Sequence, residues 1–359
     1  MTPPPKKRRR RWPLAIAAML VGTTLAVAGV EILLRTLDPI GLNYAGEFHR
    51  YVTQAVEYSW QGKALADVDL DGHLLRMKPG IELDLGSFRV RSNRFGLRGP
   101  EVAEPKPADT FRVLLLGDSV AFGWGVDEEV TFARRLETEW NAAAKRPRLE
   151  VVDTGHPLYD TVQQAATLRE FLPRLQPDLV LLVYVTNDLE PSRDTVEALL
   201  GGPPPDPAEI PVLPHDFWSW TGETLQSVTP ALGQLLAAQT NIERRVQRGL
   251  GGRTYAPETF GKGPRGWARS QKALREIRDS CAAVKVPFLL LDHTRPAITS
   301  LPTFCGAEGI AIAPFAFSDA DLANGICISL LDSHANAKGH DLLLQRLRTL
   351  LLERGLLPR

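Results

Sequence analysis

Apolar runs alternate with amphipathic segments through the C-terminal two thirds of the chain. The runs at 113–116 and 179–185 are apolar throughout, which is typical of parallel strands buried on both faces. Strands that alternate with helices of ten or more residues indicate βαβ units with right-handed crossovers, so the pattern predicts an α/β fold. The predicted strands are 113–116, 149–152, 179–185, 286–291 and 310–312, and the predicted helices are 128–143, 161–175, 267–284 and 336–354.

The N-terminus has the pattern of a membrane segment. A basic block at residues 6–11 precedes an uncharged run at 12–30, and a helix of that run spans about 29 Å, close to the thickness of a bilayer core. Ala26-Val27-Ala28 also resembles a signal-peptide cleavage site. Because the apolar stretch continues to residue 34, we favour an uncleaved, single-pass anchor at 12–34 in the inner membrane.

This anchor determines the expected compartment. The positive-inside rule keeps residues 1–11 in the cytoplasm and places the remainder on the periplasmic, extracytoplasmic side. Seven of the 42 basic side chains and one of the 42 acidic side chains lie in the first 35 residues, so the rest of the chain is acidic by six charges. An acidic domain lacks the basic face that nucleic acids require, which excludes a nucleic-acid partner.

The exported part is predicted to have two sections. Residues 35–110 form a pre-domain or linker region without clear periodicity, except that 88–92 alternates like a short strand. The main domain covers 111–355, and a Pro- and Gly-rich insertion at about 191–266, with a partly helical stretch at 225–250, interrupts it.

The three cysteines leave two interpretations open. In an oxidising compartment Cys305 and Cys327 could form a disulfide, with Cys281 buried in a helix; alternatively, all three are buried thiols. Their spacing and that of the histidines match no metal-binding motif, so we expect neither a metal nor an organic cofactor.

Four short motifs follow predicted strands or precede the last helix. Ser119 ends a Gly-Asp-Ser sequence after the first buried strand, Gly155 follows the second strand and Asn187 the third, and Asp332 and His334 precede the last helix. A serine nucleophile needs a general base, and the base needs a carboxylate that fixes its tautomer. Backbone N–H groups and an amide side chain can stabilise an oxyanion. Since the carboxyl ends of parallel strands share one edge, we expect these groups to converge.

In this order the four motifs resemble the four blocks of the SGNH, or GDSL-type, hydrolases, over about residues 111–350. The resemblance implies a flavodoxin-like three-layer α/β/α sandwich with a parallel sheet, here preceded by one transmembrane helix. The triad it implies is Ser119, His334 and Asp332, and the oxyanion donors it implies are the Ser119 and Gly155 backbone N–H groups and the Asn187 side chain.

The chain departs from the family pattern at two places. Val185 replaces a glycine that often precedes the Asn-Asp pair, so the backbone near Asn187 is expected to differ. The acid and the histidine are spaced Asp-x-His, where Asp-x-x-His is more common. Three other histidines are candidates for a role at the site. His156 is a candidate substrate contact, and His293 and His340 are alternative bases.

An upstream segment, 92–101, also resembles one found before the Gly-Asp-Ser block in membrane-anchored bacterial members. The structural interpretation of this segment is that it docks the pre-domain region onto the main domain.

The resulting hypothesis is a membrane-anchored serine esterase that removes small O-acyl groups. Its partners would be an acyl-ester substrate, such as an acylated glycan, and the bilayer. An O-acyltransferase that modifies envelope polysaccharide would use the same acyl-serine, and an inactive binding protein would keep the fold without turnover. An α/β-hydrolase is disfavoured because Ala121 stands where its Gly-x-Ser-x-Gly motif requires glycine.

Overall fold

The computed structural model describes most of the chain outside the predicted insertion. Helix α1 (Trp12–Leu37) and the α/β domain belong to separate units, and each is described by itself. The predicted helical stretch at 225–250 lies almost wholly outside the described residues. The described residues are 12–37, 43–143, 147–190, 192–201, 256–259, 263–329 and 332–358, with Thr229 and Leu232.

Helix α1 has the length and composition of a membrane span. Its segment Trp12–Leu34 has 23 residues, which corresponds to about 35 Å of helix. None of its most apolar window is buried inside the protein, so packing in a protein core does not explain its hydrophobicity. A signal sequence satisfies the same criteria.

The main sheet has five parallel strands in the order β6-β5-β7-β8-β9. Numbered from the first strand of this sheet, the order is 2-1-3-4-5, the flavodoxin-like order. All five strands coincide with apolar runs in the sequence, and their boundaries differ from the predicted ones by at most three residues. The strands are β5 (Thr110–Leu116), β6 (Arg148–Asp153), β7 (Leu179–Tyr184), β8 (Phe288–Asp292) and β9 (Ala311–Pro314).

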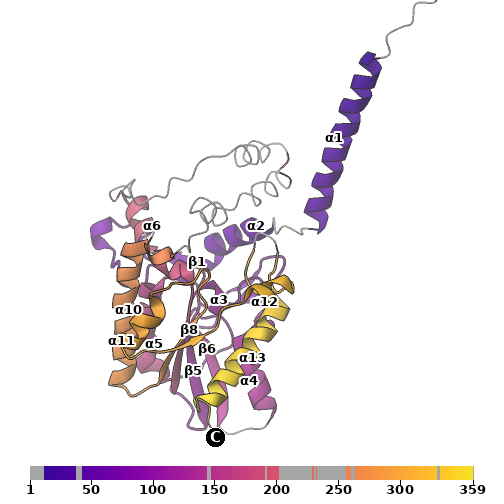
Figure 1. Cartoon of the computed structure of the whole chain (residues 1–359). Helices are drawn as coiled ribbons and strands as arrows, with labels where there is room; N and C mark the ends of the chain where they lie inside the picture. The colour runs from indigo at the N-terminus through magenta and orange to yellow at the C-terminus, as the bar shows by residue number, and fades with distance from the viewer. Residues whose placement is uncertain are drawn as a thin grey trace, which may run out of the picture. The chain divides into compact units, whose positions relative to one another are not determined.

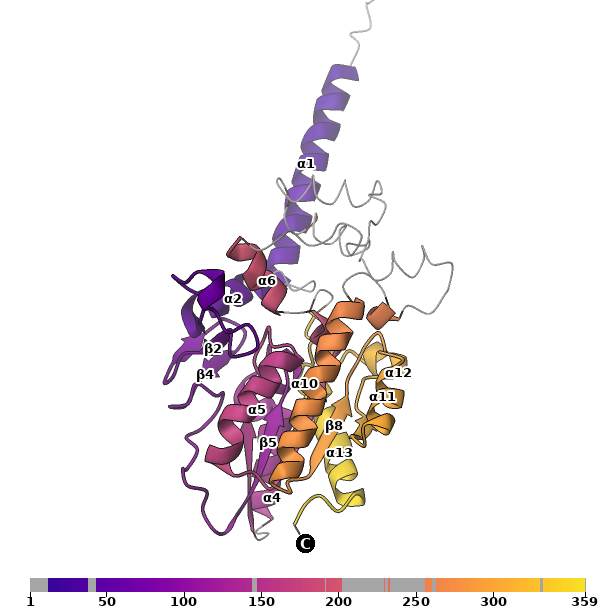
Figure 2. The same ribbon diagram turned by 90° about the vertical axis from the view of Figure 1, so that its left-hand side faces the viewer.

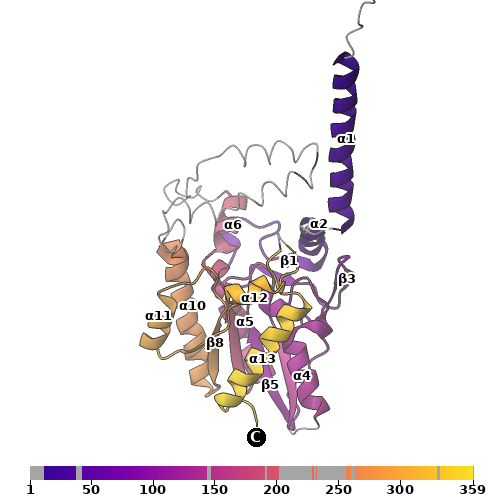
Figure 3. The same ribbon diagram turned by 45° about the vertical axis from the view of Figure 1, so that its right-hand side comes forward.

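Helices cover both faces of this sheet, so the predicted three-layer sandwich is confirmed. Helices α4 and α13 lie on one face, and α5, α10 and α11 on the other (Figures 1 and 3). Turned by 90°, α5 and α10 lie in front of β5 and β8 (Figure 2). The helices are α4 (Phe132–Ala142), α5 (Thr161–Leu175), α10 (Gly263–Ala283), α11 (Leu301–Ala307) and α13 (Ala337–Glu353).

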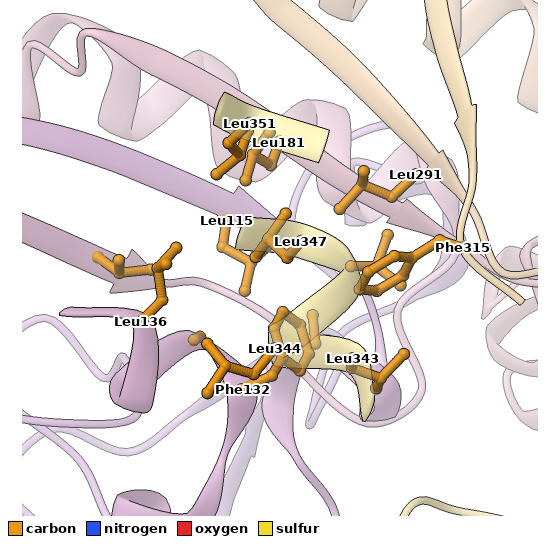
Figure 4. Close-up of a cluster of buried hydrophobic side chains, with 14 of the residues drawn as sticks. Leu115, Phe132, Leu136, Leu181, Leu291, Phe315, Leu343, Leu344, Leu347 and Leu351 are labelled. Carbon is orange, nitrogen blue, oxygen red and sulfur yellow. The ribbon is translucent and has the colours of Figure 1, made fainter. Parts of the chain in front are cut away.

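Helix α13 closes the fold with a leucine stripe. Leu343, Leu347 and Leu351 follow at intervals of four and point towards the strands and α4 (Figure 4). The helix begins where the Asn336 side chain accepts the backbone N–H groups of Lys338 and Gly339. These leucines share one buried cluster with side chains from the strands and from neighbouring elements: Leu115, Phe132, Leu136, Leu181, Leu291 and Phe315.

Local capping explains where two helices begin. The predicted helix at 128–143 starts only at Phe132, because the Thr131 hydroxyl accepts the Arg134 N–H at 3.3 Å. Helix α5 starts at Thr161 as predicted, since Asp160 accepts the Gln163 N–H at 3.0 Å.

Residues 44–110 fold against the α/β domain. This region contains two antiparallel strand pairs, β1–β2 and β3–β4. Tyr51 in η1 and Phe88 between β3 and β4 contact Trp124 in a shared aromatic cluster. The predicted strand at 88–92 corresponds to β4. The elements are α2 (Asn43–Arg50), η1 (Tyr51–Ala55), β1 (Val56–Tyr58), η2 (Leu65–Asp67), β2 (Leu75–Met77), β3 (Glu82–Asp84) and β4 (Arg89–Arg91).

Several short helical segments were not predicted, because they are too short to show a clear period; η3 is the exception, since it lies within the helix predicted at 128–143. Two of them, α3 and η4, follow strands of the main sheet at its carboxyl edge. The segments are α3 (Ser119–Phe122), η3 (Glu128–Val130), η4 (Thr186–Leu189), α6 (Ser192–Leu199), η6 (Pro257–Thr259) and α12 (Asp319–Ala323).

The three cysteines are free, so the disulfide interpretation is wrong. Cys305 is buried in the cluster under α5, α10 and α11, whereas Cys327 packs against the cluster on the opposite face of the sheet. The sheet therefore separates the two sulfur atoms. Cys281 is buried in α10, as expected.

The leucine stripe makes a stability prediction. Leu347 is 1% exposed, whereas Leu352 on the same helix is 54% exposed. We expect Leu347→Ala to lower the free energy of unfolding by about 2–5 kcal/mol, because it leaves a cavity in a packed core. Leu352→Ala is the matched control and should change it by less than about 0.5 kcal/mol. Urea titration followed by circular dichroism measures both, and equal losses would contradict the packing described.

Candidate active site

Ser119 is the first residue of α3, directly after β5. The turn is tight: a Cβ at Gly117 would lie 2.6 Å from the Ala121 Cβ, so only glycine fits there. The Asp118 carboxylate accepts the Val120 N–H at 2.9 Å and caps the helix. The strand end and this cap together hold Ser119 at the carboxyl edge of the sheet.

A continuous hydrogen-bond series links Ser119, His334 and Asp332. The distance from Ser119 Oγ to His334 Nε2 is 2.8 Å, and from His334 Nδ1 to Asp332 Oδ1 it is 2.6 Å. A carboxylate only accepts, so Nδ1 carries the proton and Nε2 is left to accept from the serine hydroxyl. This geometry allows the imidazole to take up the serine proton.

The short Asp-x-His spacing is compatible with this geometry. Asp332 Oδ1 accepts the backbone N–H of His334 at 3.0 Å as well as its ring N–H. The side chain of Asp332 is nearly buried, whereas that of His334 is one fifth exposed. A buried carboxylate therefore orients an imidazole that remains open to solvent.

Asn187 lies at the same edge, in η4. Its side-chain amide donates to Asp118 Oδ2 at 3.1 Å, and the Ser119 hydroxyl lies 3.3 Å from the same oxygen. Burial raises the pKa of Asp118, and the hydrogen bonds from Val120 N–H and Asn187 oppose that shift. Asp118 thus joins the loops that carry the serine and the asparagine.

Gly155 packs directly against the serine turn. A Cβ there would lie 2.6 Å from the Phe122 backbone nitrogen and 2.9 Å from the Asp118 carbonyl oxygen, which only glycine avoids. Its N–H donates to Asp153 Oδ1 at 2.8 Å. Burial raises the pKa of Asp153 to about 7, and the Gly155 N–H bond acts in the opposite direction. The predicted oxyanion donor therefore has a carboxyl partner in this structure.

His156 is buried, and both of its ring nitrogens lie against protein groups. Nε2 is 3.0 Å from the Tyr51 hydroxyl, and Nδ1 lies against the Pro157 carbonyl. Burial lowers the pKa of His156 to about 4, so the ring is neutral at physiological pH. These contacts favour a packing role over the predicted substrate contact.

The two alternative bases are also packed into the fold. His340 Nδ1 accepts the Phe132 N–H at 3.2 Å, and burial lowers its pKa to about 3. His293 Nδ1 lies 3.2 Å from the Phe315 carbonyl, and burial lowers its pKa to about 4. The histidine that accepts a hydrogen bond from the Ser119 hydroxyl is His334.

Val185 does not disturb the asparagine loop. The residue is extended, with φ −124°, so no glycine is required at this position. Its N–H donates to Asp188 Oδ2 at 2.8 Å, and the other oxygen of Asp188 accepts from Thr161 and Gln164. This buried carboxyl fixes the turn that carries Asn187.

Aromatic residues that the sequence did not predict lie beside the imidazole. The Tyr44 ring centroid is 6.2 Å from that of His334, and Phe48 and Trp124 pack behind it. Burial, and then the negative charge of Asp332, raise the pKa of Tyr44. The only signal in the sequence is a pair of aromatics four residues apart in the short segment Asn43–Arg50.

No group of His, Cys, Asp and Glu side chains within the described ranges has the geometry of a metal site.

Two solved structures match this chain at low sequence identity. An esterase, EstA, from Pseudoalteromonas sp. is 12% identical, with 67% of this chain and 97% of that chain covered and a TM-score of 0.41. A G-D-S-L family lipolytic protein from Veillonella parvula is 11% identical, with coverages of 67% and 98% and a TM-score of 0.39. No curated protein is detectably similar in sequence.

The family assignment comes from the sequence itself. Residues 115–342, more than half of the chain, match the GDSL-like lipase/acylhydrolase family. The matched range contains the Ser119 turn, the Asn187 loop and the Asp332–His334 loop, and the five-stranded parallel sheet agrees with the sheet that the resemblance to this family implied. The chain therefore belongs to the SGNH, or GDSL-type, hydrolases.

Proposed function

We propose that the protein is a serine esterase that hydrolyses acyl esters through Ser119, His334 and Asp332. The observation that carries the proposal is the hydrogen-bond series of 2.8 and 2.6 Å that joins these three side chains. Ester hydrolysis in general follows from the family; the assignment of the three roles is our inference.

In the proposed mechanism, His334 Nε2 takes the hydroxyl proton while Ser119 Oγ attacks the ester carbonyl carbon. Asp332 stabilises the imidazolium that forms. The proton then passes to the departing alcohol oxygen, which leaves an acyl-serine. Water repeats the sequence, releases the carboxylic acid and restores the serine hydroxyl.

Three groups are proposed as oxyanion donors: the N–H groups of Ser119 and Gly155 and the side chain of Asn187. Asn187 has two amide hydrogens and gives one to Asp118, whereas Gly155 has a single N–H that already donates to Asp153. We therefore expect Asn187 to contribute more to transition-state stabilisation than Gly155.

The proposed substrate is a small O-acyl ester, such as an acylated glycan, and the proposed location is the periplasmic side of the inner membrane. The apolar helix supports membrane association through residues 12–34, with residues 1–11 in the cytoplasm. Transfer of the acyl group to a sugar hydroxyl would use the same intermediate. The intact Ser119–His334 hydrogen bond favours an enzyme over a binding protein.

The nucleophile can be tested with a fluorophosphonate probe, which labels activated serines. We expect the wild-type protein to be labelled and Ser119→Ala to lose the label completely. Ser87→Ala, at an exposed position in the turn between β3 and β4, is the matched control and should be labelled like the wild type. A folded wild-type sample that does not react would count against the proposal.

The role of Asn187 can be tested by steady-state kinetics on p-nitrophenyl acetate. Asn187→Ala should lower kcat about 100- to 1,000-fold, the usual cost of one lost oxyanion donor. KM should change by less than about threefold, because the donor acts mainly in the transition state. Asn324→Ala, an exposed asparagine after α12, should leave both constants unchanged. An unchanged kcat in Asn187→Ala would remove that residue from the role.

The anchor can be tested by fractionating cells that express a C-terminally tagged protein. We expect the full-length chain in the membrane fraction, resistant to high salt but released by detergent, because a 23-residue apolar helix inserts in the bilayer. A processed, soluble periplasmic form would refute the uncleaved anchor while leaving the esterase proposal intact.

A further inference from the structure

Arg98 is a buried cation in the segment 92–101. The side chain is 3% exposed, and its guanidinium donates to four backbone carbonyls: Phe122 at 2.5 Å, Gly123 at 2.8 Å, Val126 at 2.6 Å and Arg89 at 3.3 Å. Arg89 lies in β4, and the other three acceptors lie in the turn that directly follows the nucleophile helix α3.

The backbone carbonyls of this turn accept hydrogen bonds from a side chain outside the turn, that of Arg98. Helix α3 has four residues, so the carbonyls at its end cannot be satisfied within the helix. Gly123 ends the helix in a left-handed conformation, with φ 75°, which turns the chain away. The Arg98 guanidinium donates to the Phe122 carbonyl at the end of the helix and to the Gly123 carbonyl, which also accepts the Val126 N–H at 3.4 Å.

The same turn is connected to both ends of the proposed triad. The N–H groups of Gly123 and Trp124 each donate to the Ser119 carbonyl at 3.0 Å, so a shift of the turn moves the nucleophile. On its other side, a Cβ at Gly125 would lie 1.8 Å from Ile328 Cδ1 and 4.0 Å from Asp332 Oδ2. The turn therefore packs against the loop that carries the acid.

The contacts of Arg98 suit an arginine specifically. Its planar fork reaches several acceptors at once, and the guanidinium lies 4.5 Å from the centre of the Phe122 ring. A lysine ammonium carries its three N–H groups on a single nitrogen, so it does not reproduce the reach of the planar fork.

The segment that carries Arg98 is itself fixed. Asn93 Oδ1 accepts the N–H groups of Phe95 at 2.9 Å and Leu97 at 3.2 Å, and its amide donates to the Pro100 carbonyl. A bridge pairs Ser92 with Arg98. This segment lies outside the family match at 115–342.

We propose that Arg98 is a positioning residue: it fixes the turn at 122–126 and thereby holds Ser119 Oγ within reach of His334 Nε2. The inference rests on the proposed function, because it assigns a catalytic purpose to that hydrogen bond. It also gives the segment 92–101 a role beyond docking.

The test compares Arg98→Lys and Arg98→Ala with Arg94→Ala, a half-exposed arginine of the same segment. Activity on p-nitrophenyl acetate is expressed per site titrated with a phosphonate, so unfolded molecules do not count. We expect Arg98→Lys to lower kcat about 10- to 100-fold with KM within threefold, since displacements of about 1 Å cost this much. Arg98→Ala should lose more than Arg98→Lys, and Arg94→Ala should match the wild type.

A second measurement does not require turnover. A proton NMR signal of the His334 Nδ1–H, identified by its absence in His334→Ala, should be sharp and downfield in the wild type and shifted or broadened in Arg98→Lys. Wild-type turnover tests the esterase proposal separately, because the NMR comparison holds even if the substrate is wrong.

Two results would overturn the positioning role. One is an Arg98→Lys protein with a wild-type kcat per titrated site and an unchanged Nδ1–H signal. The other is failure of both variants to give any folded protein, which would assign Arg98 to the stability of the fold.

Discussion

The hydrogen bond between Ser119 Oγ and His334 Nε2 joins two loops that lie 215 residues apart in the chain. Gly117, which directly follows β5 and is too crowded for any side chain, sets the turn that carries Ser119. Asn336 caps the start of α13 and so fixes the end of the loop that carries His334. The leucine stripe of α13 then holds that loop against the sheet. The packing of α13 on the sheet therefore also positions the loop that carries His334 near Ser119.

The sequence was most informative where burial is complete. The second half of β5, residues 113–116, and all of β7 are buried and apolar without interruption, and such runs can be recognised without knowledge of their neighbours. The site was predictable for a related reason: parallel strands end at a common edge, so motifs that follow successive strands must meet there. Ser119, Asn187 and His334 could therefore be grouped before their distances were known.

The structure of residues 44–110 could not be predicted from the sequence in this way. Their strands have three residues each, too few for a period of two to stand out, and their aromatic side chains pack against partners far along the chain. The contact of Tyr51 with His156 spans 105 residues, so neither residue signals the other. The erroneous disulfide has the same origin: the sequence separation of Cys305 and Cys327 does not reveal that a sheet lies between them. Contacts of this kind depend on tertiary packing, which local patterns do not encode.

The shared aromatic cluster has a consequence for how the molecule can be divided. Trp124 belongs to the turn that follows Ser119, yet Tyr51 and Phe88 from the upstream segment pack against it. A fragment cut at residue 111 would expose this indole and the rings around it to water, although it would contain every strand of the parallel sheet. The smallest autonomous piece of this hydrolase therefore begins near residue 44, and an excision guided by family boundaries alone would yield an aggregation-prone remnant.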